Sequence, residues 1–310
     1  MLDRVVAGTG TIVLGLGATA CIPGIQDADP SVRDAGTTDA GTTTTENVVP
    51  LTELTVALIP DRADKAEDNS LEDFETYLEE RLGLPVTMQV TEDYDMAVDL
   101  LVTRSVAAAY LGPFTYVQAR AKNPKVEPIV AHIEASTGRP WYTSVIVVRA
   151  DSDLTRVQDL IGQRFGFVSQ SSTSGFLVPR VMFQRLGIDP ERDFASLQFG
   201  TSHDQTLQLL LEQKVDAVAV DKAVFALGLE RGLMSLTDYV ILWESEPIPN
   251  APLVINDRVS PELKQTLQDA LVNAPVGLVG VNSAASAGYT IVQDKDYDVI
   301  REIQQSLELN

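Results

Sequence analysis

From residue 54 onward, runs typical of buried strands alternate with segments of helical periodicity. Residues 54–59 form an apolar, strand-like run, and residues 71–82 repeat apolar side chains at helical spacing. The same alternation recurs in residues 86–90 and 96–103. Gly83 follows the first helical segment, at the position where glycine favours the left-handed backbone that ends a helix. This rhythm predicts an α/β fold with largely parallel sheets.

The composition suits a soluble globular protein, and its charge limits the partners. The chain has 310 residues, of which 45% are hydrophobic and 22% are charged, and both values are ordinary for a chain with a sizeable core. The net charge of -21 repels nucleic acid and anionic membrane surfaces, so we expect no nucleic-acid partner. An anionic ligand remains compatible, because local dipoles govern a desolvated cleft more than distant, screened charges do.

Cysteine and histidine are scarce. The single cysteine is Cys21 and the two histidines are His132 and His203. One cysteine forbids an internal disulfide, and this sparse set gives no recognisable metal site. We therefore expect neither a metal nor another cofactor. His132 lies in an apolar strand-like run, where a satisfied core histidine is the better interpretation, and it receives no site role.

The N-terminal region has the order of a bacterial lipoprotein signal. Residues 5–20 are apolar and rich in small side chains, and Cys21 follows them directly. Residues 1–20 are therefore predicted to be a signal peptide and Cys21 the lipidated first residue. Asp3 and Ala18 depart from the usual pattern, so a non-lipidated secretory signal and an uncleaved anchor stay as alternatives. All three interpretations place the mature domain outside the cytoplasm, in the periplasm or at the cell surface, and lipidation would anchor it to a bacterial membrane.

Residues 21–53 are predicted to be a flexible tether. They are rich in Thr, Ala, Gly and Asp and lack the apolar content that a core needs. A tether of this composition would let an anchored domain reach a membrane partner, or serve as a simple spacer.

A hydroxyl cluster, Ser172, Thr173 and Ser174, stands before Gly175 at the start of a predicted helix. The strand-like residues 165–168 precede it, and residues 176–186 have apolar spacing that fits one helical face. Free backbone N–H groups and the positive end of the helix dipole meet at such a start, so neutral donors can hold an anion there. An ordinary N-cap explains the same residues.

Polar groups occupy two further predicted helix starts. His203 and Asp204 follow a strand-like run, where an imidazole can donate to an oxyanion and a carboxylate can accept from a ligand P–OH group. Asp221 follows the apolar run 217–220 and can accept in the same way. Either aspartate can equally be a helix cap.

Taken in order, several segments resemble the PhnD-like family of phosphonate, phosphite and phosphate solute-binding proteins of ABC transporters. These segments, which run along almost the whole chain after residue 53, are 54–61, 91–94, 110–116, 138–145, 172–179, 202–204, 215–217 and 248–252. The resemblance implies a two-lobed, type II periplasmic-binding-protein-like α/β fold that closes on an anion and performs no chemistry. It assigns residues 54–143 and 244–310 to lobe one and residues 144–243 to lobe two. It also implies a monomer that delivers its ligand to the membrane subunits of an ABC permease.

The resemblance also implies a set of ligand-binding residues. Ser172, Thr173 and Ser174 would bind the anion oxygens, and His203 would donate from the neighbouring helix start. Tyr94 and Tyr142 match aromatic positions that line the pocket in the family. A core aromatic whose hydroxyl reaches the surface is the alternative for either tyrosine.

Two departures from the family narrow the ligand. Members that bind aminoalkylphosphonates have carboxylates that would align with Ala223 and Ala251 of this chain. A buried ligand ammonium without a partner costs several kcal/mol. The expected ligand is therefore a small phosphorus oxyanion: phosphite, phosphate or methylphosphonate.

Two other function classes share features of this sequence. A ligand-sensing extracytoplasmic domain would share the fold and the pocket, and nothing inside the domain excludes it. A serine hydrolase is a weaker alternative, because no Gly-x-Ser-x-Gly elbow surrounds Ser172 or Ser174. We expect a binding protein and not an enzyme.

Overall fold

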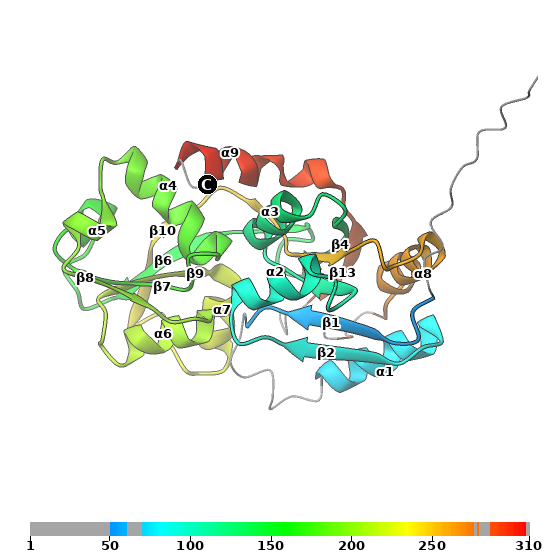
Figure 1. Ribbon diagram of the computed structural model, residues 1–310. Helices are drawn as coiled ribbons and strands as arrows, with labels where there is room; N and C mark the ends of the chain where they lie inside the picture. Colours follow the sequence, from blue (N-terminus) through cyan, green and yellow to red (C-terminus); the bar gives the residue numbers. More distant parts are fainter. Residues whose placement is uncertain (1–49, 61–69, 276–277, 279–285, 308–310) are drawn as a thin grey trace, which may run out of the picture. The chain divides into compact units, whose positions relative to one another are not determined.

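The computed structural model describes residues 50–60, 70–275, 278 and 286–307 (Figure 1). The predicted signal peptide, Cys21 and all of the predicted tether before residue 50 lie outside this part. Among the described residues, no helix is long and apolar enough to cross a membrane.

The first sheet, called here the six-stranded sheet, contains the strands nearest to both ends of the described chain. Its order is β13 (Ser286–Ile291), β4 (Glu127–Glu134), β12 (Pro252–Ile255), β3 (Ala108–Tyr110), β1 (Leu54–Leu58) and β2 (Val86–Val90). Strand β1 runs parallel to β2 and β3, whereas β12 runs antiparallel to β3 and β4, and β13 runs antiparallel to β4.

The second sheet, called the five-stranded sheet, is built from the middle of the chain. Its order is β10 (Tyr239–Glu244), β6 (Ser144–Arg149), β9 (Ala217–Asp221), β7 (Arg164–Phe167) and β8 (Ser196–Phe199). The chain passes between the two sheets through a short antiparallel pair, β5 (Trp141–Tyr142) with β11 (Ile248–Pro249). The assignment of residues to two lobes stays a prediction.

Both sheets are mixed, so the expectation of largely parallel sheets is corrected. Strands β1, β2 and β3 are parallel, as are β7, β8 and β9, and these are the strands joined by helical crossovers. The antiparallel members include β12 and β13, which join the six-stranded sheet after the chain has returned from the five-stranded one. A strand that re-enters a sheet in this way can run against its neighbours, and the strand-helix rhythm does not encode that direction.

The helices α1, α2, α4 and α6 begin and end within a few residues of the segments whose apolar spacing predicted them. The helix bounds are α1 (Ser70–Leu82), α2 (Tyr94–Val102), α3 (Pro113–Lys122), α4 (Val178–Arg185), α5 (Pro190–Asp193), α6 (His203–Leu211), α7 (Lys222–Glu230), α8 (Pro261–Val272) and α9 (Asp298–Ser306). Short helical turns are η2 (Val157–Leu160), η3 (Thr173–Leu177) and η4 (Asp294–Tyr297). Gly83 has φ +69° directly after α1, which confirms the left-handed end.

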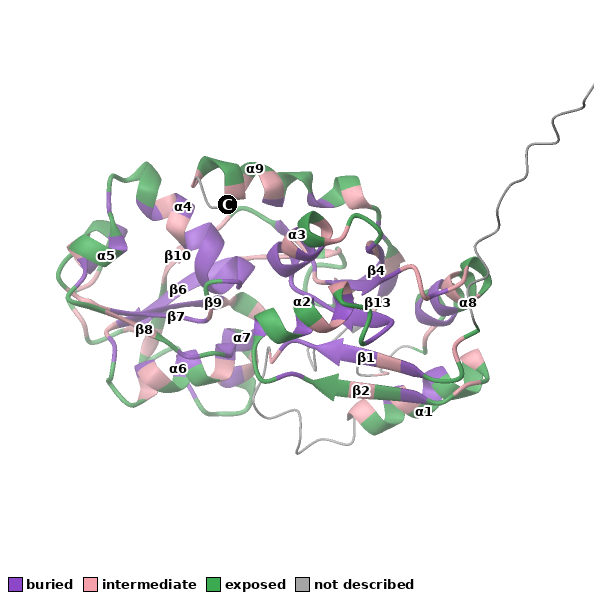
Figure 2. Ribbon diagram, in the orientation of Figure 1, coloured by how far each residue is buried: buried purple, intermediate pink, exposed green. Residues whose placement is uncertain are grey.

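Separate apolar clusters hold the two sheets. Leu54, Leu58 and Leu78 are buried between the six-stranded sheet and its helices. In the five-stranded region, the rings of Phe165 and Phe167 lie 4.7 Å apart, within an aromatic cluster against α4. Figure 2 shows that central strands such as β6 and β9 are buried, whereas the edge strand β2 and the outer faces of the helices are exposed. Each fully buried side chain of this size contributes about 1.5–3 kcal/mol, so each region has a core that can hold its loops in place.

Candidate functional site

A small cavity gathers residues from the ends of strands in both sheets. Its volume is about 30 Å³. It is lined by Ile59, Tyr94, Tyr110, Gly112, Pro113, Tyr142, Ser172, Thr173, Ser174, His203, Asp221, Asn250 and Ala251. Every predicted ligand residue except Asp204 is in this set. Their role in binding stays a prediction, but the structure brings them together.

Five helical segments begin at this cavity. Tyr94 starts α2, Pro113 starts α3 and His203 starts α6, while Thr173 starts η3, which continues into α4, and Asp221 caps α7. Each α-helix start carries a partial positive charge of about half a unit. Among the described residues that line the cavity there is no Lys or Arg. The site therefore offers positive potential from backbone dipoles rather than from cationic side chains.

Ser172 is both a helix cap and a cavity residue. Its Oγ accepts a hydrogen bond from the backbone N–H of Gly175 at 3.0 Å, and its φ and ψ of -79° and 134° are those of an N-cap. A hydroxyl has one hydrogen and two lone pairs, so capping still leaves Ser172 a hydrogen to donate. The observed cap is therefore compatible with the predicted anion binding.

The turn that carries Ser172 is packed too tightly for a larger residue. The carbonyl of Gly175 accepts from the N–H of Val168, the residue that follows β7, at 3.1 Å. A Cβ added to Gly175 would lie 2.3 Å from Val168 Cγ2, which is closer than real Cβ contacts allow. Glycine is needed here because the helix start approaches the end of the strand closely.

Thr173 and its neighbours join the two sheet regions. Thr173 Oγ1 accepts from the N–H of Phe114 in α3 at 2.9 Å, and Ser171 Oγ donates to Asp95 of α2 at 2.7 Å. Within the five-stranded region, Ser144 Oγ donates to the carbonyl of Ser174 at 2.6 Å. These bonds hold the hydroxyl cluster against the starts of α2 and α3.

The imidazole of His203 has a defined tautomer. Its Nδ1 accepts from the backbone N–H of Asp221 at 3.0 Å. A backbone N–H can only donate, so Nδ1 has no hydrogen and Nε2 carries the ring proton. His203 is buried, with 3% of its surface exposed, in the first turn of α6. Its Nε2–H group can therefore donate a hydrogen bond without a formal charge on the ring.

The two aspartates are placed differently. Asp221 lines the cavity and also caps α7, because its Oδ1 accepts from the N–H of Ala223 at 2.7 Å. Asp204 lines a separate cavity with Leu207 and Val224. Successive residues of a helix point about 100° apart, since a turn takes 3.6 residues, and so Asp204 diverges from His203. Asp204 is not among the residues that line the small cavity, and its part in ligand binding stays a prediction.

Sequence reasoning missed Asn250 and gave His132 no role. Asn250 and Tyr110 line the cavity, and behind them lies a chain of buried hydrogen bonds. The Tyr110 hydroxyl and His132 Nδ1 are 2.7 Å apart, and His132 Nε2 is 2.7 Å from Glu134 Oε1. The side-chain amide of Asn250 donates to the same Glu134 oxygen at 3.3 Å. A polar residue close to two prolines, Pro249 and Pro252, was the sequence signal that could have identified Asn250 as a site residue.

One carboxylate, that of Glu244, fixes the end of β10, where the chain leaves the five-stranded sheet. Glu244, at the end of β10, accepts from Lys222 Nζ at 2.7 Å and from Thr143 Oγ1 at 2.8 Å. Burial raises the pKa of Glu244, but the hydrogen bonds from Lys222 and Thr143 outweigh it and hold the pKa below its ordinary value of 4.5. Glu244 therefore ties β10 to the residues that flank β6 and α7.

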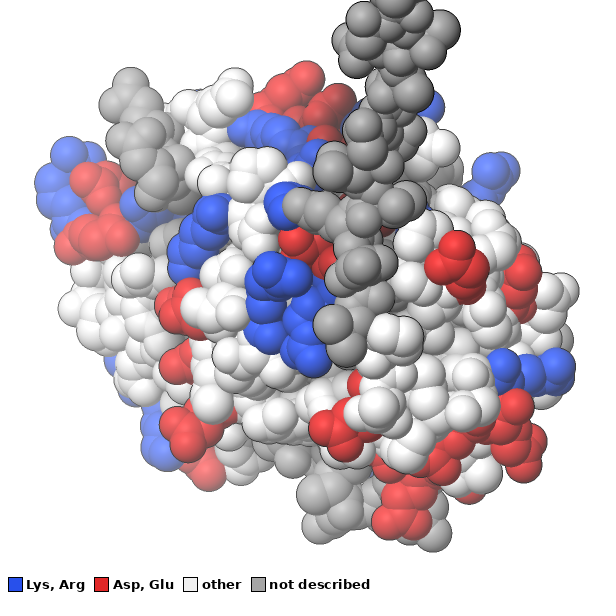
Figure 3. Space-filling view, turned by 45° about the vertical axis from the view of Figure 1, so that its right-hand side comes forward, with Lys and Arg blue, Asp and Glu red and all other residues white. Residues whose placement is uncertain are grey.

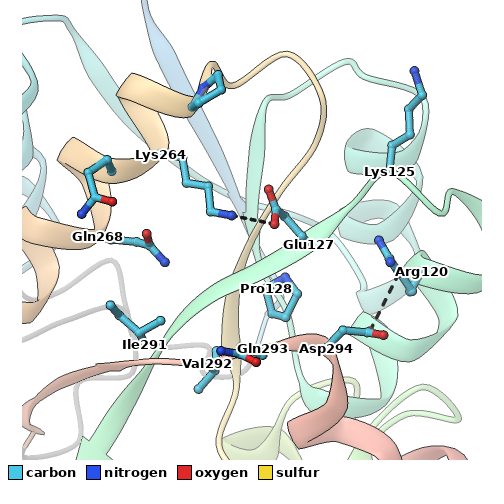
Figure 4. A pocket seen from close by; sticks show the side chains of 12 residues that line it. Arg120, Lys125, Glu127, Pro128, Lys264, Gln268, Ile291, Val292, Gln293 and Asp294 are labelled. Carbon is cyan, nitrogen blue, oxygen red and sulfur yellow. Dashed lines mark hydrogen bonds and ion pairs between the residues drawn. The ribbon is translucent and has the colours of Figure 1, made fainter.

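A larger cavity on the six-stranded region has cationic side chains in its lining. It has a volume of about 670 Å³ and is lined by Lys and Arg side chains that form ion pairs. Figure 4 shows Lys264 paired with Glu127 and Arg120 paired with Asp294. Figure 3 shows acidic and basic side chains interspersed on the surface. Cations neutralised by carboxylates give little net attraction for an anion, so the smaller cavity is the better anion site.

The family match identifies the class of protein as an extracytoplasmic solute-binding protein. Residues 56–297 match the family model described as "ABC transporter, phosphonate, periplasmic substrate-binding protein". The chain belongs to that family, whose members are transport receptors and not enzymes. The predicted family and fold class are thereby confirmed.

Three relatives illustrate the range of the match. The phosphate-import protein PhnD of Mycolicibacterium smegmatis is 27% identical, over 81% of this chain and 84% of that protein. The structure of PhnD1 from Prochlorococcus marinus in complex with methylphosphonate has a TM-score of 0.75 and 23% identity, and the match covers 84% of this chain and 99% of that one. The tetrathionate sensor histidine kinase TtrS of Salmonella typhimurium is 30% identical, over 43% of this chain and 24% of the kinase.

Proposed function

We propose that this protein is a lipid-anchored receptor that captures a small phosphorus oxyanion, namely phosphite, phosphate or methylphosphonate, and delivers it to the membrane subunits of an ABC permease. The observation that carries the proposal is the convergence of five helix starts on a cavity whose described lining contains no Lys or Arg. Such a site holds an anion through neutral donors. The names of the Mycolicibacterium and Prochlorococcus relatives agree with this ligand class.

The lining of the cavity supports a ligand without a cationic substituent. Ala251 lines the cavity. It is one of the positions where aminoalkylphosphonate receptors are expected to have a carboxylate. An alkylammonium group would therefore find no counter-charge at this position. Phosphite, phosphate and methylphosphonate carry no such group.

Capture would proceed by hinge closure. The two regions are connected through the β5 and β11 pair, and Thr173 and Ser171 bond across to α3 and α2. Closure would complete these bonds around the anion, and opening would break them. The closed form would then be presented to the permease. Lipidation of Cys21 and the tether would keep the receptor, a monomer in this proposal, near that permease.

Titration calorimetry of the purified protein tests the ligand class. Phosphite, phosphate, methylphosphonate, 2-aminoethylphosphonate and sulfate would be titrated separately at one fixed pH. We expect micromolar or tighter binding to a small phosphorus oxyanion, with loss of affinity in Ser172→Ala. Tightest binding to 2-aminoethylphosphonate would refute the argument from Ala251.

The anchor has a separate test. Mass spectrometry of the protein from its native membrane should show diacylglycerol on Cys21, and Cys21→Ala should release the protein into the soluble fraction. An unmodified Cys21 in a protein that still sediments with membranes would contradict lipidation.

Sensing is the second candidate function, because the match to the sensor kinase TtrS covers 43% of this chain. Crosslinking in intact cells distinguishes the two candidates. A permease partner supports transport, whereas a histidine kinase partner supports sensing.

A further inference from the structure

Asn250 stands where the chain returns from the five-stranded sheet to the six-stranded sheet. It lies between β11 and β12, in neither strand, and it lines the small cavity. Only 3% of its surface is exposed. A buried backbone group outside a strand ladder needs a partner from elsewhere. For the N–H of Asn250, that partner is the carbonyl of Pro140, at 3.0 Å.

The carbonyl of Asn250 is bonded by Tyr297, the last residue of the short helical turn η4. The Tyr297 hydroxyl donates to this carbonyl at 3.0 Å, and the direction is certain because a carbonyl oxygen can only accept. Tyr297 is fully buried, and burial raises the pKa of its phenol well above the ordinary value of 10.0. The hydroxyl therefore keeps the hydrogen that it donates at neutral pH.

Tyr297 is itself held against α3. Its ring packs edge-on against the ring of Tyr116 in α3, with the ring centroids 4.9 Å apart. The Tyr116 hydroxyl donates to the carboxylate of Asp294, the first residue of η4. Arg301 in α9 donates to the backbone carbonyl of Asp294 at 3.0 Å. Both ends of η4 are thus fixed, and the Tyr297 hydroxyl reaches Asn250 from a defined position.

We propose that Tyr297 is a positioning residue for ligand binding, because its hydrogen bond holds the backbone of Asn250 where that residue lines the cavity. This role rests on the proposed function. Without the hydroxyl, a buried carbonyl would lose its donor, which is costly. The segment could recover that loss only by turning the carbonyl toward another donor or toward water. Such a movement would displace Asn250 from its place in the cavity wall, and affinity for the ligand would fall.

Tyr77 in α1 provides a matched control. Its hydroxyl donates to the backbone carbonyl of Ala270 at 2.6 Å. Ala270 is buried in the last turn of α8, where helix carbonyls have no partner within the helix. Neither Tyr77 nor Ala270 lines the cavity. Tyr77→Phe therefore removes the same kind of bond as Tyr297→Phe, from a tyrosine hydroxyl to a buried carbonyl, away from the proposed site.

Titration calorimetry of the wild-type protein and the two variants tests this role. Phosphite, phosphate and methylphosphonate would be titrated separately at one fixed pH, and urea denaturation without ligand would measure the free energy of unfolding. Both variants should lose stability, because each leaves a buried carbonyl without its donor. Tyr297→Phe should also weaken binding of the preferred anion about fivefold, the scale of one hydrogen bond. Tyr77→Phe should leave affinity unchanged, and equal affinity in the two variants would overturn the proposal.

Asn250→Ala shows whether Tyr297 acts through Asn250. This variant keeps the backbone carbonyl and removes the side chain, so it should itself weaken binding. In its background, Tyr297→Phe should change affinity by about twofold or less, compared with about fivefold in the wild-type background, because two residues that act as a unit are not additive. Equal factors in the two backgrounds would mean that Tyr297 affects the ligand by another route. Unchanged affinity in Asn250→Ala alone would refute the role even if Tyr297→Phe did not fold.

The outcomes distinguish this role from the proposed function. If the wild-type protein binds none of the three phosphorus oxyanions, the proposed function is refuted and the role of Tyr297 with it. If the wild-type protein binds one of them and Tyr297→Phe binds it as tightly, only the role of Tyr297 is refuted. Tyr297→Phe removes one oxygen atom and adds no other heavy atom, and its denaturation curve shows whether the affinity is that of folded protein.

Discussion

The five-stranded region meets the cavity with hydroxyl groups and an imidazole, whereas the six-stranded region meets it with tyrosines and an asparagine. In the first, Ser172 and His203 stand at helix starts, and local backbone bonds fix them. In the second, Tyr110 and Asn250 are fixed by side chains that come from distant parts of the chain. The first region therefore builds its part of the site from contacts that are local in the fold, whereas the second builds its part from side chains that lie far apart in the sequence.

The largest expected effect comes from the helix start of the five-stranded region. Gly175→Ala would place a Cβ 2.3 Å from Val168 Cγ2 and 2.9 Å from Ser172 Oγ. We expect a loss of about 2–3 kcal/mol in the free energy of unfolding, with loss of anion binding because the Ser172 cap is displaced. Urea denaturation and calorimetry measure the two effects.

Gly228→Ala is the matched control for that change. Gly228 lies inside α7, and its added Cβ would be 3.4 Å from the sulfur of Met234 at the closest. Alanine is favoured over glycine in a helix by about 1 kcal/mol, so this variant should be as stable as the parent or more so. Equal stability of the two variants would show that the close approach at Gly175 has no cost.

His203 tests whether donation into the cavity or local anchoring matters more. His203→Ala should weaken oxyanion binding by roughly 10- to 100-fold, because a donor to a charged group contributes about 1.5–3 kcal/mol. Gln at this position can place a donor near Nε2, and Asn can place an acceptor near Nδ1. We expect His203→Gln to bind better than His203→Asn by calorimetry. The reverse order would mean that the bond from the Asp221 N–H is the important one.

The bond between Ser171 and Asp95 joins the two regions without lining the cavity. Ser171→Ala removes this 2.7 Å bond, which should weaken oxyanion binding about fivefold, because about 1 kcal/mol is lost from the closed form. Asp99→Asn is the control, since Asp99 pairs with Lys122 at 2.9 Å within the six-stranded region. It should leave affinity unchanged. If Ser171→Ala bound the oxyanion as tightly as Asp99→Asn, the bond between Ser171 and Asp95 would not stabilise the closed form.

The parts of the fold that the sequence predicts are those that depend on local patterns. The helix starts were predictable because strand ends, hydroxyl residues and apolar periodicity are local patterns, and α6 begins at the predicted His203. The direction of the antiparallel strands could not be predicted, because β12 joins the sheet more than a hundred residues after β4. The direction of a strand that re-enters a sheet depends on the path of the intervening chain.

The site residues show the same difference between local and non-local features. His132 was correctly expected to be a strand histidine with satisfied bonds, and it lies in β4 with two partners. Its link to the cavity through Tyr110 was missed, because β3 and β4 are not neighbours in the sheet and β12 lies between them. Asn250 was missed because the β5 and β11 pair brings it back to Glu134. Non-local pairing, rather than residue type, placed both.

The smallest expected effect concerns the end of the five-stranded sheet that is remote from the cavity. Arg164 donates to Asp216 through Nε at 3.0 Å and Nη2 at 2.6 Å, and its hydrogen bonds lower the pKa of Asp216 below the ordinary value of 3.8. A carboxyl with a depressed pKa stabilises the fold above its unfolded-state pKa, and that contribution is lost as pH falls through the folded-state value.

Asp216→Asn should cost about 1 kcal/mol in the free energy of unfolding near neutral pH, allowing for solvent screening. The difference from the parent should shrink as pH drops below 3.8. Urea denaturation at several pH values measures it, and a difference independent of pH would contradict the ion pair as its cause. Affinity should not change, because Asp216 directly precedes β9 and Asp221 ends it, about 16 Å apart at 3.3 Å per residue. A stability loss that left binding intact would confirm that the strand ends at the cavity, and not the sheet as a whole, carry the site.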